Sequence, residues 1–223
     1  MMHAESRIFA ALPLRERWFV RGRLASAPLT EVAARTRGDD LLEIGCGHGA
    51  LLALLAAGHP ERRVTGLDPD PRKLELARRS VGRLGNVTLV ATDVERFAAA
   101  HPAAFDTVCI ADVLYLIDVA AWVGFLHAAH RLLRPGGRLI LKEAEDDGSW
   151  RARKALWQER LMVYVLGRTR SSGAVGFAPR ATLLAAVARA GFRIDETISL
   201  ARGYTTPHLL VTATVDTPPA ARA

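Results

Sequence analysis

Residues 41–57 read LLEIGCGHGALLALLAA, and this stretch decides the fold. An apolar run ends at three glycines in alternate positions, Gly45, Gly47 and Gly49, and a strongly apolar run follows them. The pattern predicts a buried strand, a tight turn and a helix that starts near Ala50. Glycine accepts positive φ in such a turn and lets a ligand approach the backbone closely. The first amides of a helix lack intrahelical partners and can donate to a ligand, so the turn is a candidate cofactor-binding site.

The glycine turn does not identify that cofactor on its own. Residues 45–50 also satisfy the relaxed dinucleotide fingerprint G-x-G-x-x-G/A. A strand-to-helix turn with no ligand is a further reading, although three glycines are more than a plain turn needs. The remainder of the chain has to distinguish these alternatives.

Further short apolar segments follow the turn, with helical segments between them. The next strands are expected at Arg63–Leu67, Val87–Ala91, Thr107–Ala111 and Arg138–Lys142. The helices are expected at Ala50–Gly58, Pro71–Leu84 and Val119–Leu133, with a turn at residues 135–137. This alternation predicts a parallel sheet with helices on both faces. Ligands bind at the carboxyl ends of such strands, and Asp68, Asp93 and Asp112 lie at or just after three of them.

The last third of the chain predicts a closing hairpin. A helix at Pro179–Ala190 precedes two strands, Phe192–Leu200 and His208–Val215, whose short connection makes them antiparallel. The expected fold is therefore α/β and Rossmann-like, a seven-stranded, mostly parallel sheet with an antiparallel final strand.

We expect three parts along the chain: an N-terminal helical lead-in at 1–38, the main domain at 39–216 and a disordered tail at 217–223. Residues 149–178 break the strand–helix alternation and form a helical insert. Its helix carries aromatic side chains, among them Trp150 and Trp157, along one stripe. It can pack on the core, cover an acceptor pocket as a lid, or lie on a membrane surface.

Composition excludes several classes of protein. Half of the 223 residues are hydrophobic, yet no run of about 18 apolar residues suggests a membrane span, and the start lacks a signal-peptide core. Two cysteines suit a reducing, cytoplasmic setting. The net charge is +7, but the 27 arginines are spread along the chain, and a compositional bias explains them as well as a nucleic-acid partner does. Without a basic platform interleaved with aromatic residues, we expect no nucleic-acid partner.

Five motifs in order resemble those of the class I S-adenosylmethionine-dependent methyltransferases. Residues 43–49 (EIGCGHG) resemble the first motif, and 66–68 (GLD) the second. Residues 92–94 (TDV) resemble the third, and 105–114 (FDTVCIADVL) the fourth. Residues 132–139 (LLRPGGRL) resemble the segment before strand five. Each motif alone is weak evidence for the resemblance, but five motifs in order at successive strand ends are strong evidence. A nicotinamide-dependent enzyme would not need the later motifs.

The resemblance implies S-adenosyl-L-methionine as cofactor and S-adenosyl-L-homocysteine as product. The residues expected to bind it are Glu43, Gly45, Cys46, Gly47, Asp68, Pro69, Asp93, Val94 and Asp112. Asp68 would accept from the ribose hydroxyls and Asp93 from the adenine amine, while the Val94 amide meets a ring nitrogen. Alternatives stay open, because Asp68 or Asp93 could cap the following helix and Asp112 could be a turn residue only. Arg17 or Arg21 could pair with the donor carboxylate.

The expected reaction is in-line displacement at the donor methyl group by a small-molecule acceptor, apolar in one reading. The chain lacks the Asn/Asp-Pro-Pro-aromatic signature, the Pro-Cys nucleophile and an added target-recognition domain. Candidate catalytic residues are His208, Tyr115 and Tyr204, with His208 preferred as the base, although a lone histidine is often structural.

Two rival functions remain at this stage: a nicotinamide-dependent oxidoreductase, and a protein that binds the cofactor without turnover. The oligomeric state is left open. The acidic cluster of residues 143 and 145–147 has the oxygen ligands that a magnesium site needs. A solvated or charge-paired turn is the simpler explanation of these acids, so no metal is expected.

Overall fold

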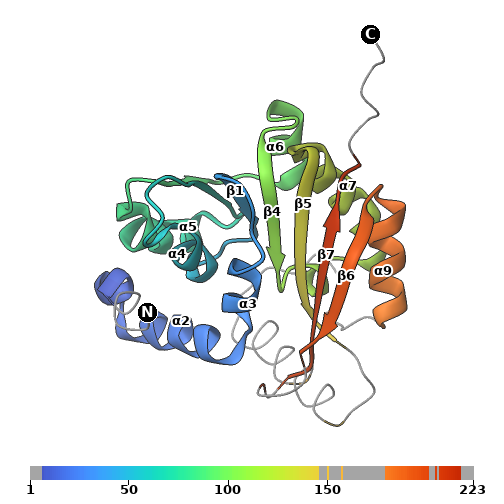
Figure 1. The fold of residues 1–223 in the computed structure, drawn as a ribbon. Helices are drawn as coiled ribbons and strands as arrows, with labels where there is room; N and C mark the ends of the chain where they lie inside the picture. Colours follow the sequence, from blue (N-terminus) through green and yellow to red (C-terminus); the bar gives the residue numbers. More distant parts are fainter. Residues whose placement is uncertain are drawn as a thin grey trace.

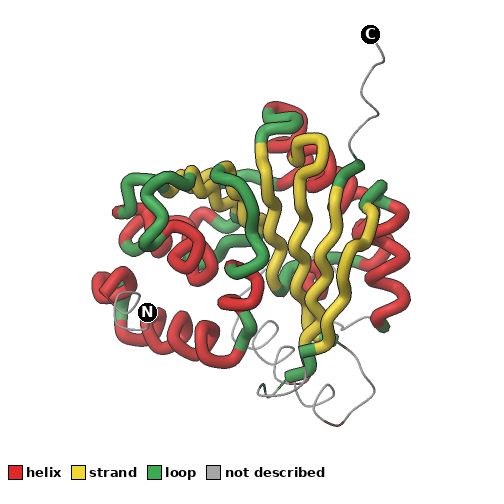
Figure 2. The backbone as a smooth tube through the Cα atoms, in the orientation of Figure 1, coloured by secondary structure: helices red, strands yellow, loops and turns green. Residues whose placement is uncertain are grey.

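A seven-stranded sheet forms the centre of the computed structural model, which describes residues 7–145, 150, 157, 179–200, 204 and 206–216. The strand order is β3-β2-β1-β4-β5-β7-β6. Figure 1 labels the part of the sheet from β1 through β4, β5 and β7 to β6, and Figure 2 shows the strands in yellow in the same view. The strands are β1 Asp40–Ile44, β2 Arg63–Leu67, β3 Val87–Val90, β4 Phe105–Ala111, β5 Leu133–Ala144, β6 Arg193–Ser199 and β7 His208–Thr214.

The pairing confirms the expected topology. Strands β1 to β5 pair in parallel, whereas β7 runs antiparallel to both β5 and β6. The order reverses between β1 and β4, which places the switch point of the sheet at the glycine turn. In open α/β sheets, the crevice at this point is where ligands bind.

Helices cover both faces of the sheet, as expected. Those described are α2 Leu14–Ser26, α3 Leu29–Ala33, α4 Ala50–Ala56, α5 Pro71–Arg79, α6 Val94–Ala100, α7 Trp122–Leu132 and α9 Arg180–Arg189. Helices α6, α7 and α9 close one apolar core, and α2 to α5 close the other (Figure 1). Within the described ranges, no helix combines the length and apolar character that crossing a bilayer requires.

Helix boundaries differ from the expectations, each for a local reason. The helix expected at Pro71–Leu84 ends at Arg79, because the Ser80 hydroxyl bonds back to two helix carbonyls and a 3₁₀ turn, η2 (Val81–Arg83), follows. The helix expected from Val119 begins as a 3₁₀ turn, η4 (Val119–Ala121), capped by the Asp118 side chain.

The expected turn at residues 135–137 is absorbed into β5. Pairing with β4 jumps from Phe105–Leu133 to Thr107–Arg138, so the glycine-containing segment forms an irregularity within the long strand. Most of the insert at 149–178 and the tail at 217–223 lie outside the described residues. Trp150 and Trp157 are described, are helical, and are 70% and 66% exposed.

Candidate functional site

The glycine turn is held tightly between β2 and the segment after β4. The amides of Gly45 and Cys46 both donate to the Leu67 carbonyl at 2.8 Å. Gly45 has φ +77°, and a Cβ there would lie 2.5 Å from a methyl group of Val113. The turn therefore requires glycine at position 45 for both its backbone conformation and its packing.

A Gly45→Ala variant is expected to lose more stability than Gly58→Ala. Gly58 has a similar φ of +80°, but no atom of the described residues lies within 4 Å of the place that a Cβ would take, so the substitution carries only the left-handed penalty of about 1 kcal/mol. Gly45→Ala adds overpacking against Val113, which costs about 1–3 kcal/mol more. Urea unfolding measures both variants, and equal losses would contradict the close packing at Gly45.

Asp68 joins the end of β2 to the glycine turn. Its side chain is 5% exposed, its Oδ2 accepts from the Gly47 amide at 2.9 Å, and its Oδ1 accepts from the Asp70 amide at 2.8 Å. Asp70 caps α5, because its carboxylate accepts from the Arg72 amide. Asp68 therefore does not cap this helix. A carboxylate offers about four acceptor positions, so Asp68 retains capacity for further donors.

Glu43 is a second buried acid beside the turn. It lies on β1, is 4% exposed, and its Oε2 has no hydrogen-bond partner among the described residues. Burial raises the pKa of Glu43 to about 8, against the opposing effect of the Arg23 charge. A buried carboxyl with an unpartnered oxygen fits a cationic group of a ligand.

Helix α2 contacts the glycine turn and the end of β4 with one of its sides. Glu16 pairs with His48 of the glycine turn at 3.1 Å, and the Phe19 ring lies 5.1 Å from the His48 ring. Arg23 Nη2 donates to the Ala111 carbonyl at 3.0 Å. This side of α2 therefore helps to enclose the site.

Arg23 is a site residue that the sequence reasoning missed. The guanidinium of Arg21, one of the two arginines expected here, lies 6.0 Å from the centre of the exposed Trp18 ring, whereas Arg23 is 3.2 Å from the Asp112 carboxylate. The available signal was helical spacing, because positions 16, 19 and 23 share one face of a helix.

Asp112 forms a largely buried ion pair with Lys142 of the neighbouring strand. Its carboxylate oxygens lie 2.6 and 2.7 Å from Nζ of Lys142, whose side chain is fully buried in β5. Asp112 has φ +58°, and its amide donates to the Lys142 carbonyl at 2.8 Å. Burial raises the pKa of Asp112, but the Lys142 and Arg23 charges outweigh it and lower the pKa overall.

Glu143 holds the segment that follows β4. Its Oε1 accepts from the amides of Val113 and Leu114 at 2.9 and 2.8 Å. Burial, together with the nearby Asp112 charge, raises the pKa of Glu143 to about 8. Asp112 and Glu143 thus both fix the loop that packs against Gly45.

Two of the three candidate catalytic residues lie together. His208 begins β7, is 5% exposed, and its Nε2 lies 3.3 Å from the Ser26 carbonyl, while Nδ1 has no partner among the described residues. Burial, then the Lys142 charge, lowers the pKa of His208 to about 4. The Tyr204 ring packs edge-on against His208 at 5.5 Å. Tyr115 is half-buried in η3 (Leu114–Leu116), after β4.

The remaining expected cofactor residues follow β2 and β3. Asp93 is exposed, and its Oδ1 accepts from the Arg96 amide at 2.8 Å. It therefore caps α6, which is the alternative role that the sequence left open for it. Val94 is buried at the start of α6, and Pro69 is exposed between Asp68 and Asp70.

The acidic cluster after β5 is described only in part. Glu143 binds the backbone amides, and Glu145 Oε2 accepts from the Ser199 hydroxyl at 2.9 Å. Residues 146 and 147 lie outside the described ranges. Among the residues the structure describes, no group of three or more His, Cys, Asp or Glu side chains is arranged to hold a metal.

Comparison with known proteins finds a methyltransferase domain in the chain. Residues 41–137 match a family model described as a methyltransferase domain. The chain is 37% identical over 125 residues to the ubiquinone biosynthesis O-methyltransferase of Methylocella silvestris, covering 54% of this chain and 43% of that protein. The chain thus spans less than half of that relative's length.

Solved structures show the same fold. An O-methyltransferase family protein from Burkholderia thailandensis matches with a TM-score of 0.70 at 21% identity, over 96% of this chain and 63% of that chain. The 1,6-didemethyltoxoflavin-N1-methyltransferase of the same organism, solved with S-adenosylhomocysteine, matches with a TM-score of 0.64 at 20% identity, over 86% and 79% of the two chains. The match over residues 41–137 is to a methyltransferase domain, in agreement with the class I S-adenosylmethionine-dependent methyltransferase motifs of the sequence.

Proposed function

We propose that this chain transfers a methyl group from S-adenosylmethionine to a small-molecule acceptor. A lone pair of the acceptor forms the new bond to the methyl carbon, and the carbon–sulfur bond breaks with its electrons passing to sulfur. The observation that carries this proposal is the pair of buried carboxyl groups, Glu43 and Asp68, beside a glycine turn at the switch point of the sheet. Both the family match and this donor set support it.

The residues present fit the donor. Glu43 has an unpartnered buried oxygen for the ammonium group, and Asp68 has spare acceptor positions for the ribose hydroxyls. Gly45, Cys46 and Gly47 would line the methionine part, with Pro69 and Asp112 beside the site. Asp93 and Val94 would meet the adenine, and Arg23, in place of Arg17 or Arg21, would be the arginine of α2 beside the site. The chain's own task is to orient the donor and exclude water.

Donor binding at pH 7 is expected to release close to one proton. Glu43 is protonated at this pH because burial raises its pKa to about 8, and an ammonium group placed beside it favours the carboxylate. The proton then leaves to the buffer. Calorimetric titration in two buffers of different ionisation enthalpy measures the release, and Glu43→Gln, which has no proton to lose, is the control. Equal heats in both buffers for the unsubstituted chain would place the ammonium elsewhere.

For the acceptor side, we assign His208 as the base where one is needed. Its Nε2 is directed to a backbone carbonyl, its Nδ1 is unpartnered among the described residues, and its low pKa keeps the ring neutral near pH 7. Tyr204 and Tyr115 are proposed to line the acceptor pocket. Full turnover by His208→Gln with an identified acceptor would remove this role.

The experiment that tests the function is release of S-adenosylhomocysteine in the presence of a panel of small metabolites. A relative named as a ubiquinone biosynthesis O-methyltransferase and a structural neighbour named as a 1,6-didemethyltoxoflavin-N1-methyltransferase support including ubiquinone precursors and 1,6-didemethyltoxoflavin. Donor binding with no turnover on any acceptor would favour the protein that only holds the cofactor, and binding of NAD(P) instead would favour the oxidoreductase. We also propose a reducing, cytoplasmic setting, which suits the free and buried Cys46 and Cys109.

A further inference from the structure

The side of α2 that faces away from the site has an unusual surface. Leu14 and Trp18 are each 69% exposed, and Arg15 and Arg21 are exposed beside them. At about 100° per residue, these four positions fall within about 120° of the helix circumference. We call these four residues the outer face of α2.

Charge on this helix is divided between its two sides. The single acid of α2, Glu16, is turned inward to His48, and Arg23 is turned inward to Ala111. The outer face therefore carries two guanidinium groups, two large apolar side chains and no carboxylate. Arg21 lies over the Trp18 ring at 6.0 Å, so its charge sits directly beside the exposed indole.

Helix α2, which carries the outer face, lies at the carboxyl ends of the strands, where the site also lies. Arg23 ties α2 to the carboxyl end of β4, and β5 ends beside it at Ala144. Trp150 follows Ala144 by six residues, so it lies within about 20 Å of that edge. Trp150 and Trp157 are exposed too, and three of the four tryptophans in the chain are thus more than 60% exposed.

This chemistry fits the interfacial zone of an anionic bilayer. Indole rings favour the boundary between headgroups and acyl chains, leucine adds apolar burial, and arginine pairs with phosphate. Binding of single-stranded nucleic acid would instead use aromatic rings arranged along a basic groove, and Leu14 offers no surface on which a base can stack. A convex helix face with indole, isobutyl and guanidinium groups therefore favours lipid.

We propose that the outer face of α2 docks the protein on an anionic lipid surface. Leu14 and Trp18 enter the interfacial zone, and Arg15 and Arg21 meet headgroup phosphates. Docking in this way brings the carboxyl edge of the sheet close to the bilayer. This inference goes beyond the proposed methyl transfer and does not depend on it.

Co-sedimentation of the full chain with vesicles tests the docking. Vesicles of phosphatidylcholine with about 30% phosphatidylglycerol are compared with vesicles of pure phosphatidylcholine, roughly matched in size. We expect binding to the anionic vesicles, weakened by salt, and a blue shift of tryptophan fluorescence. Arg15→Gln and Arg21→Gln are each expected to weaken binding about fivefold, since one basic residue near an anionic surface contributes about a factor of five. Trp18→Ser is expected to weaken it about tenfold or more.

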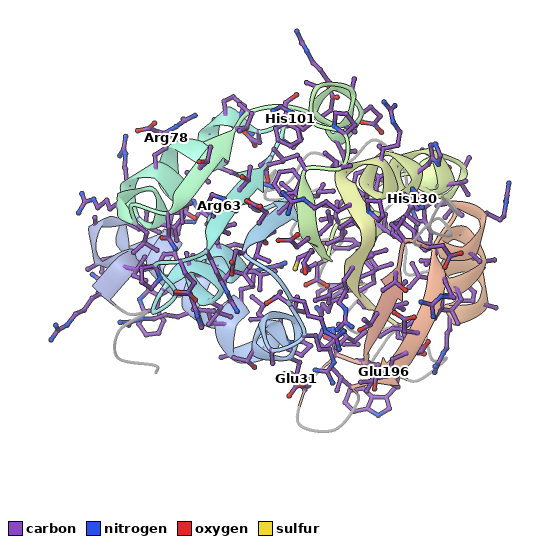
Figure 3. The ribbon with its side chains drawn as sticks, turned by 45° about the horizontal axis from the view of Figure 1, so that its top comes forward. Glu31, Arg63, Arg78, His101, His130 and Glu196 are labelled. Atoms are coloured by element: carbon purple, nitrogen blue, oxygen red, sulfur yellow. The ribbon has the colours of Figure 1, made fainter. Side chains whose placement is uncertain are left out.

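Matched controls come from exposed residues outside the outer face. Arg78, on α5, lies on a different side of the molecule from Glu31 of α3 (Figure 3), and Arg78→Gln is expected to leave vesicle binding unchanged. Val119→Ser is the apolar control, since Val119 is 49% exposed. Donor affinity is measured on every variant and is expected to stay the same, which separates this test from that of the methyl transfer. No binding to anionic vesicles, equal binding by Trp18→Ser, or Trp18-dependent binding of an oligonucleotide in place of lipid would overturn the proposal.

Discussion

Replacing Asp68 by alanine is expected to raise the dissociation constant of S-adenosylmethionine at least about a hundredfold. Charge-assisted hydrogen bonds contribute about 1.5–3 kcal/mol each, and the variant loses those to both ribose hydroxyls. It also removes the acceptor of the Gly47 amide, which lies 2.9 Å from Asp68 Oδ2, so the glycine turn loses one of its hydrogen bonds while those from Gly45 and Cys46 to the Leu67 carbonyl remain. Calorimetric titration of the folded variant measures the change.

Two neighbouring substitutions separate donor binding from folding. Asp68→Asn keeps an oxygen that accepts from the Gly47 amide, so it should fold normally and bind the donor about tenfold more weakly. Asp70→Ala removes the cap of α5 and the ion pair of Asp70 with the exposed Arg72, costs about 1 kcal/mol of stability, and should leave donor affinity unchanged. Undiminished donor affinity in Asp68→Ala would show that the ribose assignment is wrong.

Replacing Lys142 by methionine is expected to lower the free energy of unfolding by about 3 kcal/mol. The substitution leaves Asp112, whose side chain is only 11% exposed, without its closest counter-charge, and breaking a fully buried pair typically costs about 3–5 kcal/mol. We expect the lower end because Arg23 still lies 3.2 Å from the Asp112 carboxylate. Urea unfolding at pH 7 provides the measurement.

The double variant Lys142→Met/Asp112→Asn is the matched control. It removes both charges, so most of the lost stability should return, because a buried pair replaced by neutral groups of similar volume is close to neutral. If the single and the double variants are equally destabilised, shape at position 142 and not charge explains the loss.

The fold was readable from the sequence because its signals are local. Short apolar runs, glycine turns and an acid at successive strand ends mark the elements from β1 to β5 without knowledge of their neighbours. The sequence predicted the end of α5 at Leu84, whereas the helix ends at Arg79. This end depends on a single side chain, the Ser80 hydroxyl, which donates back to the helix. Such a bond leaves no periodic signal.

The site was readable only where its residues belong to a motif. Asp68 and Glu43 stand at strand ends, so the sequence marked them as candidates. The Asp112–Lys142 pair required knowing that β4 and β5 are adjacent with Ala111 opposite Lys142. Choosing Arg23 over Arg17 and Arg21 required knowing that the side of α2 with positions 16, 19 and 23 packs against the sheet.

A crystal structure of the chain with S-adenosylhomocysteine tests most directly whether the Glu43–Asp68 pair forms the donor site. We predict that the ribose hydroxyls donate to the Asp68 carboxylate and that the amino group lies against Glu43. A nucleoside bound elsewhere on the sheet, or this crevice filled by the chain's own side chains, would contradict the assignment.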